Sequence, residues 1–339
     1  MPTEDQGEQI RKIPVTIITG FLGSGKTTLL KRIVRECIGR RIAVIQNEVS
    51  EEMGIESAVL TDVDGNIIPD FFELPNGCIC CSSKDDMIVT LENIVKLGRE
   101  RIDYIVVETT GIADPCSVAE IFWLDNELGS YFFLDGIVTV VDCLNFKSVL
   151  VDSHFLKHAE VGRRQVAISD RIVVNKTDLV TSPEMDEVVA LVTSLNPSAE
   201  LCTTRNSMVS IEFVLDIGSF DSHKLSHIPH VPSSVDHVFI RFAQSVFDRR
   251  HLEVTIGEML WESSKVGSIY RAKGLFQGVN EAGRGWFGLQ AVGALFETTA
   301  QESADLVNTR GEAKFLFIGT NLDKELITHM LSDALLIDS

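Results

Sequence analysis

The amino-acid sequence predicts an α/β fold, with a mostly parallel, doubly wound sheet and a smaller α+β domain at the C-terminal end. Short apolar runs typical of buried strands alternate with helix-like segments as far as residue 217. A glycine-rich stretch separates the first of these strands from the first helix. Beyond residue 236 the alternation ends, and strand-like runs predominate. Strands that alternate with helices indicate a parallel sheet covered by helices on both faces.

Composition limits the class of protein and its partners. The chain has 339 residues, 45% of them hydrophobic, and a formal net charge of −19. This acidity disfavours nucleic acid and anionic membranes as partners, because both are negatively charged. No apolar run is long enough to span a bilayer, and residues 1–12 lack the apolar core of a signal peptide. We therefore expect a soluble protein of the cytoplasm or the nucleus.

The predicted organisation has four parts. Residues 1–12 form a polar lead that we expect to be disordered, and residues 13–217 form the α/β domain. Residues 218–236 contain glycine, prolines and serines and are interpreted as a linker. Residues 237–339 form the α+β domain. Its expected elements are strands 238–242, 268–276, 286–296 and 314–318 and helices 249–261 and 323–335.

The elements of the α/β domain are predicted from apolar periodicity and turn residues. The expected elements are strand 15–19, a helix from 26 to about 39, strand 42–46, a hairpin within 55–75, a helix from 82 or 83 to about 98, strand 104–108, a short helix after 114–115, strand 137–141, a helix around 157–169, strand 172–175 and a helix capped by Ser182. In such folds, the loops at the carboxyl ends of the strands build the site.

The first motif is the stretch GFLGSGKT at residues 20–27, which matches G-x-x-x-x-G-K-[ST]. It lies between a strand and a helix, where backbone N–H groups and the helix N-terminus cradle phosphates. Lys26 is expected to reach the β- and γ-phosphates as a catalytic residue, and Thr27 to offer its hydroxyl to Mg²⁺. The expected phosphate-side residues are Gly20, Gly23, Ser24, Gly25, Lys26, Thr27 and Thr28. An ordinary glycine-rich turn is the alternative.

The stretch Asn175-Lys176-Thr177-Asp178 ends a strand and predicts guanine recognition. A carboxylate at Asp178 would accept hydrogen bonds from N1–H and the exocyclic amine of guanine, whereas adenine offers no such pair of donors. Asn175, Lys176 and Asp178 are therefore the expected base-side residues, and GTP and GDP the expected ligands. A solvated turn is the alternative interpretation.

Glu108 and Gly111 end another strand, in the sequence E-T-T-G. Glu108 is expected to be catalytic, either by holding Mg²⁺ through water or by orienting the attacking water. Gly111 would let the backbone approach the γ-phosphate. Glu48 lies in the acidic loop after the second strand and is interpreted as a ligand of Zn²⁺ or Mg²⁺. A solvent-exposed side chain is the alternative there, because Glu51 and Glu52 lie nearby.

Cys78, Cys80 and Cys81 place three thiols within four residues. Zn²⁺ binds thiolate sulfur and prefers four ligands, so this motif predicts an incomplete zinc site suited to carrying or exchanging metal. Glu48, a histidine, a nucleotide-linked water or a partner protein would complete the site. A redox switch is the minor alternative.

Other cysteines and histidines receive simpler interpretations. The cysteines expected to be small packed residues are Cys37, Cys116, Cys143 and Cys202. Histidines of and beside the linker are interpreted as ordinary polar residues, with an accessory metal-binding tract as the alternative: His223, His227, His230 and His237. The same preference holds for His154 and His158, which are one helical turn apart if that stretch is helical.

Taken in order, the motifs resemble the CobW-like branch of the metal-chaperone GTPases. The motifs that carry this resemblance are at 20–27, 47–48, 77–82, 108–111 and 175–178. Stretches 273–275 and 318–326 look like the eukaryotic members, the zinc-regulated GTPase metalloprotein activators. The resemblance covers nearly the whole chain past residue 12. It implies a P-loop GTPase that uses GTP, Mg²⁺ and Zn²⁺, hydrolyses GTP to GDP and phosphate, and transfers zinc to a client apo-metalloprotein.

The resemblance also names partners and leaves alternatives open. Eukaryotic relatives act on type 1 methionine aminopeptidase through a Cys-Pro-Glu-Leu docking motif, which residues 1–13 lack. Many relatives have Phe-Gly where this chain has Val49-Ser50. Relatives commonly form homodimers. The alternative functions are a cobalt- or iron-inserting metallochaperone, a regulatory GTPase without metal transfer, and a zinc buffer.

Overall fold

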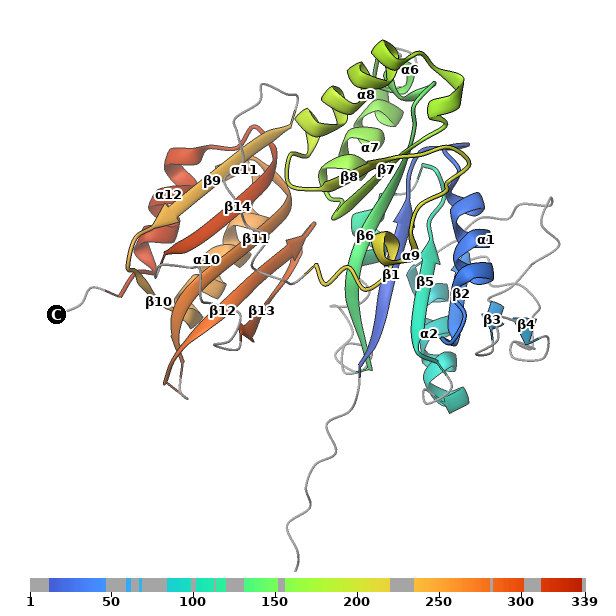
Figure 1. The fold of residues 1–339 in the computed structure, drawn as a ribbon. Helices are drawn as coiled ribbons and strands as arrows, with labels where there is room; N and C mark the ends of the chain where they lie inside the picture. Colours follow the sequence, from blue (N-terminus) through green and yellow to red (C-terminus); the bar gives the residue numbers. More distant parts are fainter. Residues whose placement is uncertain are drawn as a thin grey trace, which may run out of the picture.

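Two β-sheets organise the computed structural model, one in each half of the chain (Figure 1). The structure describes residues 12–46, 59–61, 67–68, 84–98, 102–112, 114–119, 131–151, 156–219, 235–280, 283–301 and 312–336. Among these, no helix combines the length and the apolar character that crossing a bilayer requires.

The first sheet has eight strands in the order β4-β3-β2-β5-β1-β6-β7-β8. Its strands are β1 (Ile13–Thr19), β2 (Ile42–Gln46), β3 (Val59–Thr61), β4 (Ile67–Ile68), β5 (Tyr104–Glu108), β6 (Phe132–Asp142), β7 (Arg171–Asn175) and β8 (Glu200–Thr203). Strands β2, β5, β1, β6, β7 and β8 pair in parallel with their neighbours. At the edge, β3 pairs antiparallel with β2 and with β4. Strands β5 and β7 are buried at every position, which explains their continuous apolar sequences.

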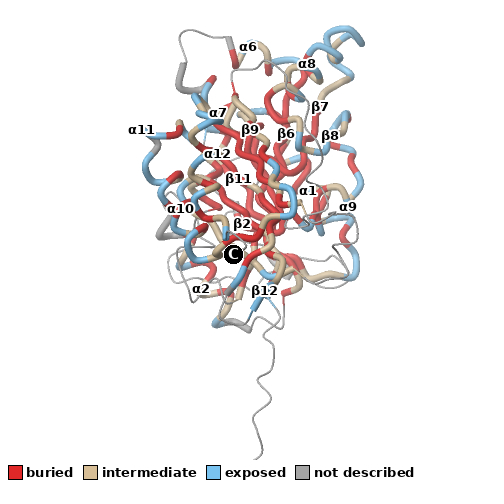
Figure 2. Tube along the Cα trace, turned by 90° about the vertical axis from the view of Figure 1, so that its left-hand side faces the viewer, coloured by how far each residue is buried: buried red, intermediate tan, exposed pale blue. Residues whose placement is uncertain are grey.

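Helices pack on both faces of this sheet. They are α1 (Lys26–Glu36), α2 (Lys84–Gly98), α3 (Pro115–Ala119), α6 (Phe146–Val151), α7 (Leu156–Ala167), the 3₁₀ helix η3 (Thr177–Leu179), α8 (Ser182–Leu195) and α9 (Ile211–Val214). Helix α1 buries Leu29 and Ile33 in one core, while α2, α7 and α8 contribute to a second core on the other face. Figure 2 shows the buried residues concentrated along the central strands. The predicted doubly wound fold is therefore confirmed.

The second sheet has the order β13-β12-β11-β14-β9, with β10 beside β11. Its elements are β9 (Asp236–Phe242), β10 (Val246–Asp248), α10 (Arg249–Trp261), α11 (Ser263–Val266), β11 (Ser268–Asn280), β12 (Gly283–Val292), β13 (Leu295–Gln301), β14 (Ala313–Thr320) and α12 (Lys324–Asp333). One face packs against α10 and α12 around Phe247, Phe276 and Phe315. The opposite face adds Tyr270 and Leu316 to a core of the first domain, so the two domains share buried apolar contacts.

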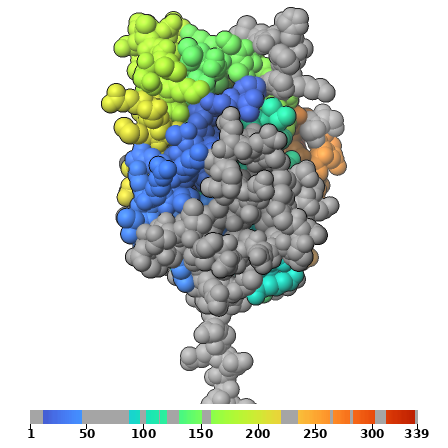
Figure 3. Space-filling model, turned by 90° about the vertical axis from the view of Figure 1, so that its right-hand side faces the viewer, coloured from blue at the N-terminus to red at the C-terminus, as the bar shows by residue number. Residues whose placement is uncertain are grey.

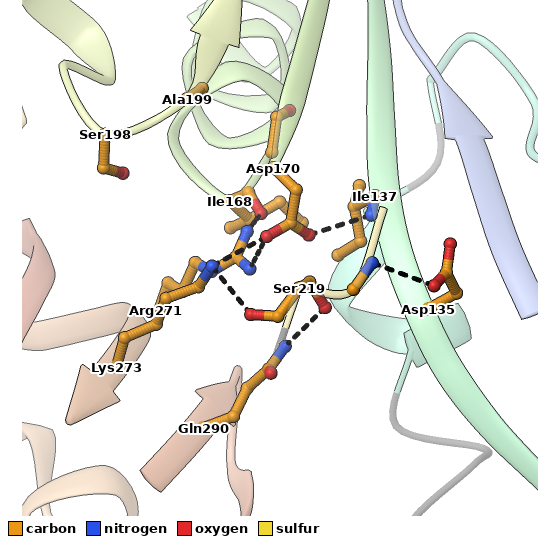
Figure 4. Close-up of polar contacts among 12 residues, drawn as sticks. Asp135, Ile137, Ile168, Asp170, Ser198, Ala199, Ser219, Arg271, Lys273 and Gln290 are labelled. Atoms are coloured by element: carbon orange, nitrogen blue, oxygen red, sulfur yellow. Dashed lines mark hydrogen bonds and ion pairs between the residues drawn. The ribbon is translucent and has the colours of Figure 1, made fainter. Parts of the chain in front are cut away.

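A buried ionic cluster also joins the two domains (Figure 4). Asp170, directly before β7, accepts hydrogen bonds from Arg271 and, at 2.8 Å, from Lys273 of β11. Arg271 is 2% exposed and also donates to the carbonyl oxygen of Ile168. Burial alone would raise the pKa of Asp170, but the charges of Arg271 and Lys273 outweigh burial and lower the pKa to about 2. Removing either sign of charge would leave the other buried and unpaired.

The structure corrects several predicted elements. Stretch 286–296, expected as one strand, contains a turn at Gly293 that separates β12 from β13; its φ of 60° favours glycine. Helix α8 is capped by Thr181 and not by Ser182. Thr181 and Glu184 form a capping box that satisfies the first backbone N–H groups of the helix.

The beginning of the expected linker docks on the first domain. The backbone N–H groups of Ile217 and Gly218 donate to the carboxylate of Asp135 at 2.7 and 3.0 Å, and Ser219 donates to its carbonyl. Residues 220–234 lie outside the described residues. Helix α1 ends at Glu36, earlier than predicted. Strands β8 and β10 were not predicted, because both are short and β8 is only half-buried.

Candidate functional site

Residues 20–25 form the loop between β1 and α1, whose first two residues, Lys26 and Thr27, complete the motif; glycines shape this loop. Gly20 and Gly25 have φ values of 138° and 110°, which favour glycine. A side chain at Gly20 would collide with the carbonyl oxygen of Val140, and one at Gly25 with the amide of Asn175. The loop therefore packs directly against the carboxyl ends of β6 and β7, where a ligand of this fold is expected.

Two side chains of this loop are suited to an anionic ligand. Lys26 is 4% exposed, and its Nζ donates to the carbonyl oxygen of Phe21 at 3.3 Å, so the ammonium lies back over the loop. Ser24 is fully buried, and its hydroxyl has no hydrogen-bond partner in the described structure. An unsatisfied buried hydroxyl costs free energy, which a phosphate oxygen would recover. Thr28 lies on the exposed side of α1.

Thr27 and Glu108 come together from α1 and the end of β5. The Thr27 hydroxyl donates to Glu108 Oε1 at 2.7 Å, and Glu108 is fully buried. A hydroxyl beside a carboxylate at a phosphate-binding loop is a set of oxygen donors of the kind that Mg²⁺ takes. This geometry fits the magnesium role predicted for Thr27 and the first of the two roles predicted for Glu108.

The loop after β5 lies against the phosphate-binding loop. A Cβ atom at Gly111 would lie 2.5 Å from the backbone nitrogen of Leu22, so only glycine allows this approach. The Gly111 carbonyl accepts a hydrogen bond from Nε2 of Gln165 in α7 at 3.2 Å. Three residues further on, Asp114 forms an ion pair with Arg164, the neighbour of Gln165. Helix α7 thus holds the segment that follows Glu108.

On the opposite side, Asn175 joins the predicted guanine motif to the phosphate-binding loop. It is 2% exposed, and its Nδ2 donates to the Ser24 carbonyl at 2.9 Å. Lys176 has a φ of 63°, and its Nζ donates to Asp142 Oδ2 at 2.7 Å. Asp178 is exposed in η3. The two motifs, far apart in sequence, therefore form one continuous site.

Ser207 is a site residue that the sequence interpretation missed. It is fully buried with a φ of 53°, and its backbone N–H donates to Asn175 Oδ1 at 2.9 Å. Its hydroxyl accepts from Asn175 Nδ2 and donates to the Gly25 carbonyl, both at 3.0 Å. Figure 3 shows the yellow segment after β8 beside the blue surface of residues 12–46. A prediction of strand β8 would have placed Ser207 at this edge of the sheet.

The structure does not describe the residues of the predicted zinc site. Cys78, Cys80, Cys81 and Glu48 lie outside the described residues, so the predicted zinc site stays a prediction. Within the described ranges, no three histidine, cysteine or acidic side chains gather as a metal site would require. His237 contacts the Leu195 carbonyl through Nε2 at 3.1 Å, while the other three histidines of the linker are outside the described part.

The remaining cysteines are packed as expected. Cys37, Cys116 and Cys143 are buried, and Cys202 is partly buried. Burial raises the pKa of Cys37 and Cys143, and it raises the pKa of Cys202 to about 11. Such thiols are poor nucleophiles and poor metal ligands, because both roles need the thiolate.

Two family models and several known proteins are similar to this chain. The family model described as "CobW/HypB/UreG, nucleotide-binding domain" matches residues 14–203, and "Cobalamin synthesis protein cobW C-terminal domain" matches residues 237–335. The "Zinc-regulated GTPase metalloprotein activator 1" of Schizosaccharomyces pombe is 32% identical over 369 residues, covering 94% of this chain and 85% of that protein.

Two bacterial proteins extend the comparison. The "Zinc chaperone CobW" of a Sinorhizobium species is 34% identical over 229 residues, or 61% of this chain and 63% of the relative. The crystal structure of Zn(II)-bound YjiA GTPase from E. coli has the same fold, with a TM-score of 0.68, 22% identity and coverage of 96% of this chain and 99% of that one. Two domain matches in the expected order, together with a relative aligned along nearly the whole chain, show that this chain belongs to the CobW family of P-loop GTPases.

Proposed function

We propose that this chain is a GTP-hydrolysing zinc chaperone, which binds Zn²⁺ at Cys78, Cys80 and Cys81 and transfers it to a client apo-metalloprotein. One observation carries the nucleotide half of the proposal: Asn175 connects the guanine motif to the phosphate-binding loop through its bond to the Ser24 carbonyl. The zinc half is supported by the cysteine motif and by relatives named zinc-regulated activator and zinc chaperone.

The proposed hydrolysis uses residues from both edges of the loop. Lys26 and the backbone N–H groups of residues 20–27 bind the β- and γ-phosphates and offset their charge. Thr27 and Glu108 would hold Mg²⁺, which supplies further charge neutralisation when it is bound. Glu108 also orients the attacking water, directly or through that site. Asp178 selects guanine by accepting from its two edge donors.

Zinc transfer would depend on coupling between the nucleotide and the cysteine motif, with Glu48 as a candidate further ligand. If GTP tightens zinc binding, zinc must tighten GTP binding by the same factor. Hydrolysis then weakens the zinc site and favours transfer to the client. We propose an apo-metalloprotein client, with methionine aminopeptidase as the first to test, and a homodimer in the cytoplasm or nucleus.

The decisive experiment measures zinc affinity by chelator competition with Mg·GTPγS and with Mg·GDP. We expect tighter zinc binding with GTPγS, and loss of that difference in the Cys78/Cys80/Cys81→Ser variant. Cys202→Ser is the matched control, because this thiol is packed in the fold and should leave zinc binding unchanged. Equal zinc affinities in the two nucleotide states would contradict coupling and favour a regulatory GTPase or a zinc buffer.

The base assignment has a separate test. Asp178→Asn is expected to weaken GTP binding and favour xanthosine triphosphate, since the amide can donate to the additional carbonyl of xanthine. Asp186→Asn is the matched control, because Asp186 is an exposed aspartate on the neighbouring helix α8. It should leave the preference for GTP over xanthosine triphosphate unchanged. An unchanged preference in Asp178→Asn, measured by competition binding, would remove Asp178 from the site.

A further inference from the structure

Helix α7 connects the nucleotide site to the C-terminal domain through two consecutive residues. Gln165 is 1% exposed and donates to the Gly111 carbonyl, and Arg164 pairs with Asp114. The Arg164 guanidinium also lies over the ring of Tyr270, 4.5 Å from its centroid. Tyr270 belongs to β11 of the C-terminal domain. Helix α7 therefore binds the segment after Glu108 at Gly111 and Asp114, and the other domain contacts that helix.

The contact from β11 depends on an irregularity of the strand. The pairing of β11 with β14 shifts between Ile269 and Arg271, which leaves Tyr270 as a bulged residue. Consecutive side chains of a regular strand point to opposite faces, but a bulge redirects them. Tyr270 and Arg271 both reach the first domain: Tyr270 contacts Arg164, and Arg271 binds Ile168 and Asp170. The two side chains at the bulge therefore contact one short stretch, residues 164–170, at the C-terminal end of α7 and just beyond it.

Asp114 stabilises the positive charge of Arg164 at this contact. Burial alone would lower the pKa of Arg164, but the nearby charge of Asp114 outweighs burial and raises the pKa. The guanidinium is therefore charged when it faces the Tyr270 ring, as a cation–π contact requires. The Tyr270 hydroxyl lies 3.1 Å from Thr320 Oγ1 in β14, a hydrogen bond within its own domain.

We propose that Gln165 and Arg164 are positioning residues for the γ-phosphate end of the site, and that Tyr270 acts through Arg164 to set the preference for GTP over GDP. This inference rests on the proposed GTP-binding function. Gln165 and Arg164 hold the segment of Gly111 and Asp114 against the phosphate-binding loop. Loosening that segment weakens contacts to the γ-phosphate and leaves the contacts to GDP intact.

The test compares the dissociation constants of Mg·GTPγS and Mg·GDP for the full chain. We expect Arg164→Met and Tyr270→Leu to weaken GTPγS at least about fivefold relative to GDP, the lower end of typical coupling. Gln165→Met, which keeps the length but lacks the amide donor, should have the same selective effect. Because Arg164 and Tyr270 form one contact, the double variant should lose no more than the stronger single variant.

Matched variants separate positioning from general damage to the fold. Tyr270→Phe keeps the ring over Arg164 and should retain the wild-type ratio of the two affinities. Arg164→Lys keeps a charge for Asp114 and should retain more GTPγS affinity than Arg164→Met. Arg163→Met changes the adjacent arginine, which donates to the Leu150 carbonyl, and should leave the ratio unchanged.

Each outcome supports or overturns the inference. Equal losses for both nucleotides, a rise in GTPγS affinity, or an unchanged ratio in Tyr270→Leu would overturn it while leaving guanine-nucleotide binding by the wild type intact. Absence of guanine-nucleotide binding by the wild type would overturn both the inference and the proposed function. If Tyr270→Leu does not fold, the affinity ratio of Arg164→Met is compared with that of Arg163→Met, and a selective loss of GTPγS binding in Arg164→Met alone supports the inference.

Discussion

The two ends of the candidate nucleotide site are held in different ways. At the guanine end, Asn175 and Ser207 bind each other and the carbonyls of Ser24 and Gly25, all within the first domain. At the γ-phosphate end, Gly111 and the segment that follows it are held by α7, which in turn contacts the second domain.

The difference indicates a division of work between the two ends. The guanine end is a set of hydrogen bonds among buried groups within one domain, so its geometry should be the same with GTP and GDP. The γ-phosphate end meets the only group by which the two nucleotides differ. The route that we propose between the second domain and that group runs through the contact of Arg164 with Tyr270.

Substitution of Asp170 should have the largest effect. In Asp170→Asn, Arg271 and Lys273 keep their charges at a buried interface, so we expect the free energy of unfolding to fall by about 3–5 kcal/mol. Urea unfolding measures this loss. Glu200→Gln is the control, because its pair with Arg171 is exposed on the Glu200 side and contributes about 1 kcal/mol or less.

The same variant sharpens the comparison between the two ends. Loss of domain docking should weaken GTPγS while GDP affinity stays near that of the wild type. An equal fall in both affinities would contradict the separation of the two ends.

The pKa of Asp170 is lowered, so the stability that its carboxylate contributes is complete above the ordinary value of 3.8 and is lost as the pH falls toward 2.

Asn175→Ala should have the next largest effect, and it should be equal for both nucleotides. The variant leaves the Ser207 N–H without its acceptor and the Ser24 carbonyl without its donor in a buried region. Ordering these unpaired groups again when a nucleotide binds should cost about 2–3 kcal/mol, so affinity should fall about a hundredfold. Titration with fluorescent GDP and GTPγS measures it. A loss confined to GTPγS would break the comparison.

Ser207→Ala should have the smallest effect of the three. It removes the hydroxyl that donates to the Gly25 carbonyl, and about tenfold weaker binding of both nucleotides is expected. Ser207→Gly removes the same hydroxyl but tolerates the φ of 53°, so a smaller loss in that variant isolates the backbone strain. Ser194→Ala, which removes a hydroxyl bound within α8, is the control and should bind both nucleotides normally.

Local sequence determined the first domain and the chemistry of its motifs. Strand β5 matches its predicted bounds because a buried parallel strand is apolar throughout, and α1 begins at Lys26 as its motif requires. The motifs at 20–27 and 175–178 contain the residues that their backbone needs. Glycines take the left-handed conformation, and Asn175 bonds to the phosphate-binding loop.

Tertiary structure decided which distant residues support those motifs. Ser207 follows a short, half-buried strand without a clear apolar pattern, so its role depends on β8 lying beside β7. Gln165 and Arg164 are ordinary polar residues of a helix until the fold places Gly111 and Asp114 beside them. The contact with Tyr270 requires a bulge, which is a property of strand pairing. Local patterns encode which residues are buried and which chemistry they offer, whereas contacts across domains arise only from packing, because no local period records a distant partner.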